Sequence, residues 1–579
     1  MRRTWWGVAT AVVAACGGGD GSPSPAYTLE RVAGDSQQVE VTTASAPLVV
    51  RVVDQDSLPV AGITVNFAVT QGSGTVTASD VTDGDGLASG VYTAASDAGA
   101  RKVRAQIPGV TQTIFDLRAT AGGVAGLQAT QGQDTPNNAG SPVTLAAKVV
   151  DGFGNAVAGA KVAWGVVSGG GAVSADTVLS DVNGIVSITR TLGSGAGGQF
   201  TRAVAVAAND TLVFHNTARK AITVLAGGNN VPDQCTSDLW IQGNYGYTGT
   251  WGSCEGQGAH LLHVWNVTAG VTHDTAITVG TGTVSDNEVS DDGALMLATS
   301  EAGSAAANGL YLYSLSDPAH PALLEFEVAA RGLHTGTFAV IGGQRYVFAA
   351  RNPHSTTVAA QAALMVYRIQ PDSADKIVQV AALTQPENYG IHDTFVRDGL
   401  AFVSDWNTGM RIYDVGDGRL AGSPASPQLV GSIVTGAAGL NCNCVHNSWW
   451  YHDAQGGKRY LFIGQEGPSD FTTASGDIHV VDLSNMAAPE EVAFFHIPNA
   501  GVHNFWMDEA RGILYAAYYN AGVVALDVTG TLSGDLASRE IARIQPGGAG
   551  NTFTWGVMLA NGSLWASDMF SGFWKLSVP

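Results

Sequence analysis

Short hydrophobic runs that alternate with polar positions recur along most of the chain, and turns rich in glycine separate them. Residues 391–397 and 400–405 form two such runs on either side of the pair Asp398-Gly399, and residues 410–415 form a third. Because successive side chains of a strand point to opposite faces, this alternation predicts β-strands, and the Asp-Gly pair predicts a tight hairpin turn. Helical periodicity is almost absent, so we expect an all-β protein.

One unit of this pattern repeats. Residues 501–506, 512–517 and 522–528 match residues 390–415 almost position for position. Repeats of roughly 40 to 50 residues built from short strands are typical of a β-propeller. Seven such units can be assigned, which predicts a seven-bladed propeller in residues 220–579. We expect the third strands of the blades at residues 260–267, 309–315, 364–369, 410–415, 477–483, 523–528 and 572–578.

The last predicted blade has three strands in the printed sequence, because the chain ends at Pro579 directly after the third one. A fourth strand must then come from elsewhere. We expect residues 221–226, a hydrophobic run before the first blade, to pair there and close the ring, since closure removes exposed strand edges. The alternative is that these residues are only a linker.

A second pattern occurs twice before the propeller. In the first copy, Val-Val-Asp at 52–54 is followed by Pro-Val-Ala-Gly and later by Thr-Asp-Gly-Asp-Gly at 82–86. The second copy has Val-Val-Asp at 149–151 and Ser-Asp-Val-Asn-Gly at 180–184. The copies are about 100 residues apart, which is the length of one seven-stranded β-sandwich. We therefore predict sandwiches at 37–120 and 133–219, joined by a linker at 123–132.

These motifs carry two resemblances. The repeated Val-Val-Asp run with its Asp-Gly or Asn-Gly turn resembles the bacterial Ig-like group 1 domains of invasin-type and intimin-type surface proteins, which implies a stalk. The C-terminal repeat resembles the LVIVD-repeat propellers of bacterial surface proteins. The expected fold is therefore all-β, with two Ig-like β-sandwiches followed by a seven-bladed β-propeller.

The N-terminus has the features of a targeting segment. Arg2 and Arg3 precede an apolar run at 5–15, which is too short to span a bilayer, and Cys16 follows directly. Residues 1–16 resemble a bacterial lipoprotein signal, which implies that Cys16 is lipidated; the alternative is an ordinary cleaved signal. Residues 17–36, rich in Gly, Ser and Pro, predict a flexible tether. We expect an extracytoplasmic protein held by its lipid to a bacterial membrane, with the outer membrane favoured, or to the cell surface.

The composition narrows the classes of partner. The 579 residues include 49 acidic and 28 basic ones, a formal net charge of −21, and no basic cluster able to neutralise phosphates. We therefore expect no nucleic-acid partner, and contact with a membrane only through the lipid.

Aromatic residues near the predicted propeller rim favour a protein or carbohydrate ligand on that face, although they could instead pack between blades. They are Trp406, Trp449, Trp450, Phe505, Trp506, Tyr518, Tyr519, Trp555, Phe570 and Trp574.

Four cysteines follow Cys16. In an oxidising compartment, Cys235 and Cys254 are expected to form a disulfide at the start of the propeller. Cys442 and Cys444 are two positions apart, so a bond between them would strain the disulfide geometry. As an alternative, this pair, just before a His, could bind a metal.

The His residues of the repeat are the strongest candidates for metal binding or catalysis. Aligning the predicted blades two to seven places Asn287, His334, His392, His446, His503 and Trp555 at one inner position. If these positions face the central channel, four imidazoles converge and could bind Fe, Cu or Zn. The alternative is that each His hydrogen-bonds backbone and locks one blade to the next. No other cofactor is predicted. The residues after each His, namely Thr335, Asp393, Asn447 and Asn504, suit either support of a ligand or a turn.

Other candidates for chemistry are weaker. The acidic residues Glu255, Glu288, Glu301 and Glu466 could lie near the axis, where two of them could form a hydrolase pair. No Gly-x-Ser-x-Gly elbow, His-Glu-x-x-His motif or phosphate-binding loop is present.

Asp80, Asp83 and Asp85 are spaced like Ca²⁺ ligands, but we favour a solvated turn for them.

Two functional hypotheses follow from the sequence. The leading one is a non-enzymatic surface lipoprotein whose Ig-like stalk displays the propeller for binding or adhesion. The other is a metal-dependent extracytoplasmic enzyme, an oxidoreductase, with its site on the propeller axis at the four aligned His residues.

Overall fold

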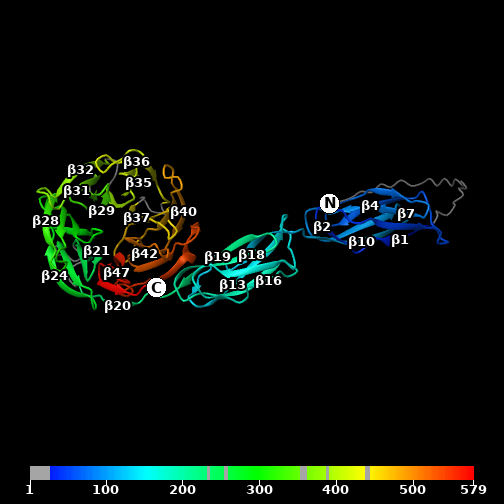
Figure 1. Cartoon of the computed structure of the whole chain (residues 1–579), viewed down its shortest axis with the longest axis horizontal. Coiled ribbons are helices and arrows are strands. Elements are labelled where there is room, and N and C mark those ends of the chain that lie inside the picture. The colour runs from blue at the N-terminus through cyan, green and yellow to red at the C-terminus, as the bar shows by residue number, and fades with distance from the viewer. Residues whose placement is uncertain (1–25, 231–234, 253–258, 353–360, 386–389, 437–443) are drawn as a thin grey trace, which may run out of the picture.

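The structure is a computed structural model that describes residues 26–230, 235–252, 259–352, 361–385, 390–436 and 444–579. Two sandwiches and a ring of sheets follow one another along the chain (Figure 1). Apart from one 3-10 turn, Ala537–Arg539, the regular elements of these residues are strands, so the all-β prediction is confirmed. In the described ranges we find no helix that could cross a membrane. The predicted lipidation site, Cys16, lies outside them.

The first sandwich packs two sheets around a core that includes Val50, Phe67 and Phe115. Its smaller sheet pairs β1 (Thr28–Ala33), β3 (Leu48–Val53) and β7 (Leu87–Gly90). The larger sheet pairs β2 (Gln38–Glu40), β10 (Thr111–Thr120), β9 (Gly99–Ile107), β4 (Thr64–Gln71) and β6 (Ser79–Val81), and β5 (Thr75–Val76) pairs with β8 (Tyr92–Thr93).

The second sandwich repeats this topology. One sheet pairs β11 (Val124–Gln131), β13 (Pro142–Asp151), β17 (Ile185–Thr191) and β15 (Ala172–Val173). The other pairs β12 (Asn137–Asn138), β19 (Asp210–Arg219), β18 (Gly197–Ala205), β14 (Lys161–Val166) and β16 (Thr177–Leu179). Its core includes Val149, Trp164 and Phe214.

Two predicted boundaries are wrong. Strand β1 lies inside the predicted tether 17–36, and β11 occupies the predicted linker 123–132. Both are edge strands, and Leu29 is the one buried residue of β1, while β11 has none. Their sequences therefore lack the hydrophobic alternation by which the other strands were found.

The repeated Asp residues hold turns. Asp54 Oδ1 accepts the N–H groups of Asp56 and Leu58 at 2.9 Å, and Asp151 Oδ1 accepts those of Phe153 and Asn155 at the same distance. Asp83 binds the N–H groups of its own turn in the same way. These carboxylates act as local turn acceptors, which agrees with the turn interpretation of the cluster at 80–85.

Within the described residues, the C-terminal strands pair into seven sheets. The first three are β21 (Cys235–Gln242), β22 (Tyr245–Trp251), β23 (Leu261–Asn266) and β24 (Thr272–Thr278); β25 (Thr283–Val289), β26 (Leu295–Glu301), β27 (Gly309–Ser314) and β28 (Ala322–Val328); and β29 (Thr335–Ile341), β30 (Gln344–Arg351), β31 (Ala363–Ile369) and β32 (Ile377–Thr384). The fourth is β33 (Ile391–Arg397), β34 (Leu400–Asp405), β35 (Gly409–Asp414) and β36 (Gln428–Ile433).

The remaining sheets complete the set. The fifth is β37 (Val445–Trp450), β38 (Tyr460–Gln465), β39 (Ile478–Asp482), β40 (Glu490–Phe495) and β44 (Gly534–Asp535), and the sixth is β41 (Phe505–Asp508), β42 (Ile513–Ala517), β43 (Val523–Asp527) and β45 (Glu540–Ile544). The seventh is β46 (Thr554–Ala560), β47 (Ser563–Asp568), β48 (Gly572–Leu576) and β20 (Val224–Gly227).

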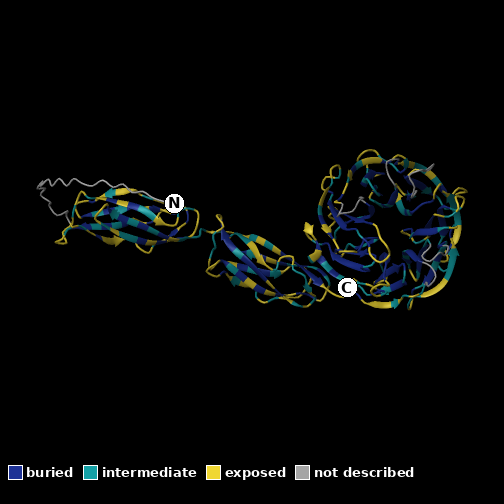
Figure 2. Ribbon diagram, turned by 180° about the vertical axis from the view of Figure 1, so that it is seen from behind, coloured by how far each residue is buried: buried dark blue, intermediate teal, exposed yellow. Residues whose placement is uncertain are grey.

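These sheets form a closed ring. The first strand of each sheet contacts the first strand of the next, in the order β21, β25, β29, β33, β37, β41, β46 and back to β21 (Figure 1). Side chains from neighbouring sheets fill the space between them, and the outer strands β24 and β28 are much more exposed than the inner ones (Figure 2). The first strands therefore surround a central channel.

The ring is closed by a strand that comes from before its first sheet. Strand β20 pairs antiparallel with β48, with Val224 opposite Leu576 and Gly227 opposite Trp574. The predicted closure is confirmed, although the pairing begins at Val224 rather than at residue 221, and the linker alternative is wrong. The segment leading out of the second sandwich thus contributes to the last sheet of the ring.

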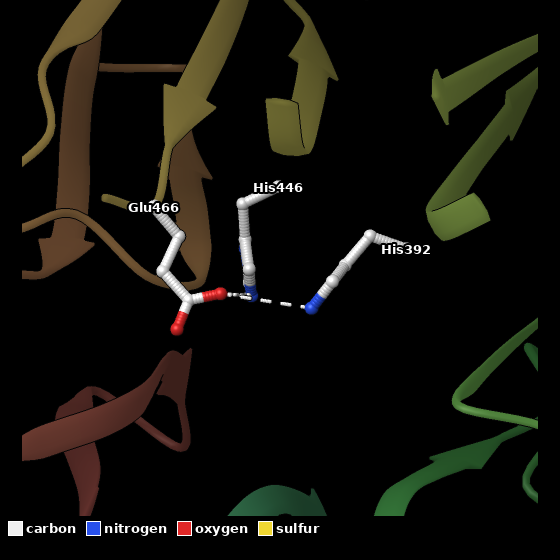
Figure 3. Close-up of side chains that lie close together, drawn as sticks. All are labelled: His392, His446 and Glu466. Atoms are coloured by element: carbon white, nitrogen blue, oxygen red, sulfur yellow. Dashed lines mark ion pairs between the residues drawn. The ribbon is translucent and has the colours of Figure 1, made fainter. Parts of the chain in front are cut away.

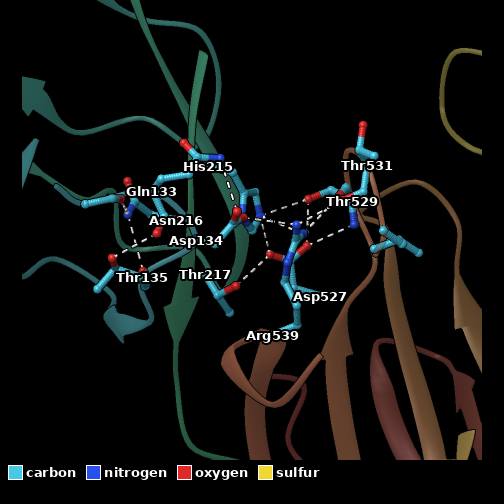
Figure 4. Close-up of polar contacts among 12 residues, drawn as sticks. Gln133, Asp134, Thr135, His215, Asn216, Thr217, Asp527, Thr529, Thr531 and Arg539 are labelled. Atoms are coloured by element: carbon cyan, nitrogen blue, oxygen red, sulfur yellow. Dashed lines mark hydrogen bonds and ion pairs between the residues drawn. The ribbon is translucent and has the colours of Figure 1, made fainter. Parts of the chain in front are cut away.

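The second sandwich also contacts the ring through a buried polar network (Figure 4). His215 in β19 lies between two carboxylates, with Nδ1 at 2.9 Å from Asp134 Oδ1 and Nε2 at 2.8 Å from Asp527 Oδ2. Thr217 donates to Asp527 at 3.0 Å, and Arg539 of the ring lies 3.1 Å from Asp134. Charged groups from both parts are therefore paired across this contact.

Candidate functional site

The structure brings the four predicted His residues together. His334 precedes β29, His392 and His446 are the second residues of β33 and β37, and His503 precedes β41. Neighbouring imidazole centroids lie 4.1, 4.3 and 3.9 Å apart along this series, and all four side chains are buried. The equivalent starts of four inner strands thus place four imidazoles in contact at one end of the channel.

Two tryptophans complete this arc into a circle of rings. Trp555, from the predicted inner position, lies 4.1 Å from His503, and Trp251 lies 4.9 Å from Trp555 and 5.7 Å from His334. Trp251 was not predicted, because it ends a second strand and has no counterpart in the repeat. Asn287, which was predicted at this position, is fully buried and donates to the carbonyl of Asp238.

Two of the imidazoles make hydrogen bonds between sheets. His334 Nδ1 lies 2.5 Å from Glu301 Oε1, which comes from the preceding sheet. His503 Nδ1 lies 2.7 Å from the carbonyl oxygen of Trp555 in the following sheet, and the ring N–H donates this bond. These contacts are of the kind expected if the repeated His locks neighbouring blades.

The other two imidazoles converge on a carboxylate. His392 Nε2 and His446 Nε2 lie 3.6 and 3.8 Å from Oε2 of Glu466, which directly follows β38 (Figure 3). One ligand atom from each residue lies within 4.8 Å of the others, and this is the one such group of His, Cys, Asp and Glu that the described ranges contain. Donors about 2.0–2.2 Å from a tetrahedral ion are roughly 3.3–3.6 Å apart, so a small closure would complete a metal site.

The protonation state of His446 suits a metal ligand. Burial, together with the charge of His334, lowers the pKa of His446 to about 3, so its imidazole is neutral at ordinary pH. Among the described residues, its Nε2 atom has no hydrogen-bond partner. Burial likewise lowers the pKa of His503 well below its usual value. His334 differs: burial lowers its pKa, but the adjacent Glu301 outweighs this effect and raises it overall.

Tyr519 positions the carboxylate of Glu466. Its buried hydroxyl donates to Oε1, which leaves Oε2 facing the two imidazoles. Burial raises the pKa of Tyr519 well above its usual value, so the hydroxyl stays protonated and remains a donor. The backbone of Tyr519 has a φ of 36°, a conformation that residues with a Cβ rarely adopt.

The side chains around these groups enclose a cavity of about 210 Å³, which we call the rim cavity. Of the aromatics predicted to lie at the rim, Trp406, Tyr519 and Trp555 line it. The remaining lining residues are Trp251, His334, Asn352, His392, Glu466, Ser469, Phe471, His503, Phe553 and Met569. The walls are therefore largely aromatic, and the ionisable groups are confined to the imidazoles, Glu466 and the hydroxyl of Tyr519.

A second cavity, of about 260 Å³, is lined by residues further along the same inner strands; we call it the channel cavity. The residues that directly follow the four His, namely Thr335, Asp393, Asn447 and Asn504, all line it. So do Trp449, Phe505 and Trp506 from the predicted aromatic set, and Glu288. Of the other predicted acids, Glu301 pairs with His334, and Glu255 lies outside the described residues.

The described cysteines are oxidised. Cys235 and Cys444 each belong to a disulfide, and Cys254 and Cys442 lie outside the described residues. A metal interpretation of the Cys-x-Cys pair is therefore wrong for Cys444, since a disulfide sulfur is not a thiolate ligand. The pairing of Cys235 with Cys254 stays a prediction.

Comparisons with known proteins cover parts of the chain. Residues 392–435, which include His392 and the fourth sheet of the ring, match the LVIVD repeat. The structure of the "D0-D1 domain of Intimin" is similar to 33% of this chain and 97% of its own length, with 18% identity and a TM-score of 0.14. That TM-score is too low to support any argument about fold or function. A search among curated proteins finds no match.

Proposed function

We propose that this chain is a stalked surface protein whose head is a seven-bladed propeller of the LVIVD type carrying a metal centre. The LVIVD match at residues 392–435 and the closed ring of four- and five-stranded sheets support the propeller assignment. Two consecutive sandwiches of one topology suit a stalk of Ig-like domains. The lipoprotein-like segment ending at Cys16 supports an extracytoplasmic location, anchored by lipid to a bacterial membrane or cell surface.

The proposed metal ligands are His392, His446 and Glu466. The observation that carries this proposal is the convergence of their donor atoms within 4.8 Å of one another beside the rim cavity, where His446 Nε2 has no hydrogen-bond partner in the described part of the chain. His446 is buried and neutral, and a metal ion would satisfy its Nε2 atom, which lacks a hydrogen bond although it lies beside the carboxylate of Glu466. The four-His ligand set expected from the sequence stays a prediction, since the Nδ1 bonds of His334 and His503 do not exclude ligation through Nε2. We favour the smaller set because, within the described residues, its donor atoms are the ones that lie within 4.8 Å of one another.

Two His and one carboxylate are the ligand set of non-haem Fe(II) enzymes. Three protein donors leave coordination positions open to a small molecule, whereas structural metal sites are usually filled by four protein ligands. The open side would face the rim cavity, whose walls are largely aromatic. We therefore favour Fe(II) and oxidoreductase chemistry in the head.

Metal analysis of the purified full-length protein tests the proposal. We expect close to one equivalent of Fe, or of Zn after aerobic purification, and its loss in His446→Ala and Glu466→Gln. His334→Gln should keep the metal, which separates this site from a four-His site. His479→Gln is the matched control, because His479 is equally buried but binds Glu491 and Gln465 instead. A folded wild-type protein that binds neither metal would overturn the proposal.

A second candidate function is binding or adhesion without metal, with a protein or carbohydrate ligand. The observation that favours it is the aromatic lining of the rim cavity, since Trp and Tyr rings supply large contact areas at low entropic cost. Metal analysis separates the two functions, because an adhesive head would bind no metal. In addition, such a head would still bind its ligand after treatment with a chelator.

A further inference from the structure

The channel cavity lies deeper along the inner strands than the His residues. Trp449 and Trp506 line it and follow His446 and His503 by three positions, which is roughly 10 Å of extended strand. Its walls repeat one pattern, in which a polar residue is followed two positions later by an aromatic one. The pairs are Asp238 with Trp240, Asp393 with Phe395, Asn447 with Trp449, and Asn504 with Trp506.

Acidic groups dominate the polar layer of this cavity. Asp238, Asp286, Glu288 and Asp393 all line it, and none of the lining residues in the described ranges is Lys or Arg. Asp286 is buried, with 8% of its surface exposed, whereas the other three are half-buried. No cation of the described chain is paired with any of the four. The cavity therefore gathers four acidic groups, and the charge of His334 acts on two of them, Asp286 and Asp393.

Half-buried aromatic rings form a girdle beside these acids. Trp506 lies 5.8 Å from Trp240 and 5.5 Å from Trp449, and Trp449 lies 5.2 Å from Phe395. The four residues come from four different sheets and line one cavity. Aromatic faces attract cations through their quadrupole, and methylated ammonium groups are recognised by cages of such rings.

Two further polar groups of the wall lack partners. Asn447 Oδ1 and Ser448 Oγ have no hydrogen-bond partner among the described residues, although Asn447 is 3% and Ser448 is 5% exposed. Buried polar atoms without partners are rare in folded proteins, and a bound water, ion or ligand is one explanation for those that occur. They add an acceptor and a hydroxyl to the acidic wall.

A compact metal ion fits this cavity poorly. No three of its carboxylates bring oxygen atoms within 4.8 Å of one another, although all four residues are described. Several oxygens are already used by backbone donors: Gly336 N–H binds Asp286 at 2.8 Å, Phe338 N–H binds Glu288 at 2.9 Å, and Thr394 N–H binds Asp393 at 2.8 Å. Charge spread around an aromatic girdle suits a larger and softer cation.

We propose that the channel cavity binds a small organic cation, an alkylammonium or methylated ammonium group. The carboxylates of Asp238, Asp286 and Glu288 face its charge, and the Trp240, Trp449 and Trp506 rings contact its carbon atoms. A neutral saccharide would use the aromatic rings but would leave the acidic layer without a counter-charge.

The pKa values of these acids show that the protein alone compensates their negative charge poorly. Burial, together with their mutual repulsion, raises the pKa of Asp238 and of Glu288 well above its usual value. Burial also raises the pKa of Asp286, although its hydrogen bonds oppose this. A bound cation would favour the ionised forms again.

Calorimetric titration of the full-length protein with n-butylammonium and tetramethylammonium, with n-butanol and glucose as neutral probes, tests the proposal. We expect at least one of the two ammonium ions to bind saturably with one-to-one stoichiometry. Neither n-butanol nor glucose should bind. Glu288→Gln and Asp286→Asn should each weaken binding by about tenfold or more. Asp317→Asn is the control, because Asp317 is exposed and pairs with His320 away from the cavity.

Three outcomes would overturn the proposal: no ammonium binding by a folded wild-type protein, equal binding of n-butanol, or binding of glucose alone. If Glu288→Gln and Asp286→Asn unfold, Trp506→Leu serves instead, since it removes a ring from the girdle and leaves the acids in place. Glu466→Gln should bind ammonium as the wild type does, so this site and the proposed metal centre can fail independently.

Discussion

His215 Nε2 lies 2.8 Å from Asp527 Oδ2, although 312 residues separate the two in sequence (Figure 4). The His belongs to the last strand of the second sandwich and the Asp to the end of β43 in the ring. Both side chains are buried, and the opposite ring nitrogen of His215 binds Asp134 of its own sandwich. The second sandwich and the ring are therefore joined by an ionic contact rather than by the connecting chain alone.

This contact predicts that the stability of the interface depends on pH. Burial lowers the pKa of His215, but its hydrogen bonds to Asp134 and Asp527 outweigh burial and raise it overall, despite the nearby Arg539. Because the pKa of His215 is higher in the folded than in the unfolded protein, the protonated imidazole stabilises the folded state. This contribution is complete below about pH 6.5, the pKa in the unfolded state, and it is lost as pH rises through the pKa in the folded state. The pKa of Asp134 is lowered by its hydrogen bond to His215, and that of Asp527 is lowered by the same partner against burial.

The lowered carboxylate pKa values contribute stability above about pH 3.9 that is lost as pH falls. We expect the interface to be strongest between about pH 4 and 6.5, and to loosen above that range. Small-angle scattering and limited proteolysis as a function of pH would measure this. His215→Gln should flatten the dependence above pH 6, whereas His320→Gln, at an exposed site, should leave it unchanged. An interface equally rigid at pH 5.5 and 8.5 would contradict the prediction.

Much of the ring, including the position of the four His residues, could be predicted from the repeat in the sequence. Matching residues 390–415 with 501–528 aligned His392 with His503, and equivalent blade positions lie at equivalent places around a ring. That is why four imidazoles far apart in sequence could be expected at one end of the channel. Closure by β20 followed from the same argument, because the last sheet lacked a strand.

The repeat could not reveal residues that break it. Glu466 follows a second strand and Trp251 ends another, and neither has a counterpart in the other sheets. Glu466 was expected near the axis, but as one of a pair of acids; its contact with the His residues, like that of Trp251, is visible only in the folded structure. The edge strands β1 and β11 were missed for a different reason. They bury almost no side chains, and hydrophobic alternation is visible only where one face is buried.

Gly227 offers a test of ring closure. Its φ is +91°, and a Cβ there would lie 2.3 Å from the carbonyl oxygen of Phe573, so Gly227→Ala must displace β20 from β48. We expect a loss of about 2–4 kcal/mol in the free energy of unfolding, from the left-handed backbone together with overpacking. Gly243→Ala is the control, because its φ is +57° but nothing lies within 4 Å of the added Cβ. Urea unfolding would measure both, and equal losses would argue against a tight closing strand.

Asn155 connects the two sandwiches. Its Nδ2 donates to the carbonyl of Ser96 at 2.7 Å, and its Oδ1 accepts the N–H of Ala98 at 2.8 Å. Asn155→Ala removes both bonds and also a 2.9 Å bond to Asp151 Oδ2 within the second sandwich, but it leaves the two cores intact. We therefore expect a wider range of angles between the sandwiches and a loss of stability of about 1–2 kcal/mol. Small-angle scattering of the full chain measures the angles, with Asn183→Ala, in an exposed turn, as the control. An unchanged distribution in Asn155→Ala would show that the sandwiches are held by other contacts.

Tyr519 tests whether the carboxylate of Glu466 must be oriented for metal binding. Tyr519→Phe removes the hydroxyl that binds Oε1 and keeps the ring, which stacks on Phe553 at 4.2 Å, so the fold should be preserved. Groups that orient a metal ligand typically contribute 10-fold to 100-fold in affinity, and we expect a loss of about that size for Zn²⁺, measured by competition with a chromogenic chelator. Tyr518→Phe is the matched control, because that buried hydroxyl donates to the carbonyl of Gly476 and does not contact Glu466. If Tyr519→Phe binds Zn²⁺ as tightly as Tyr518→Phe does, the hydroxyl has no positioning role, and Glu466 is held by its backbone alone.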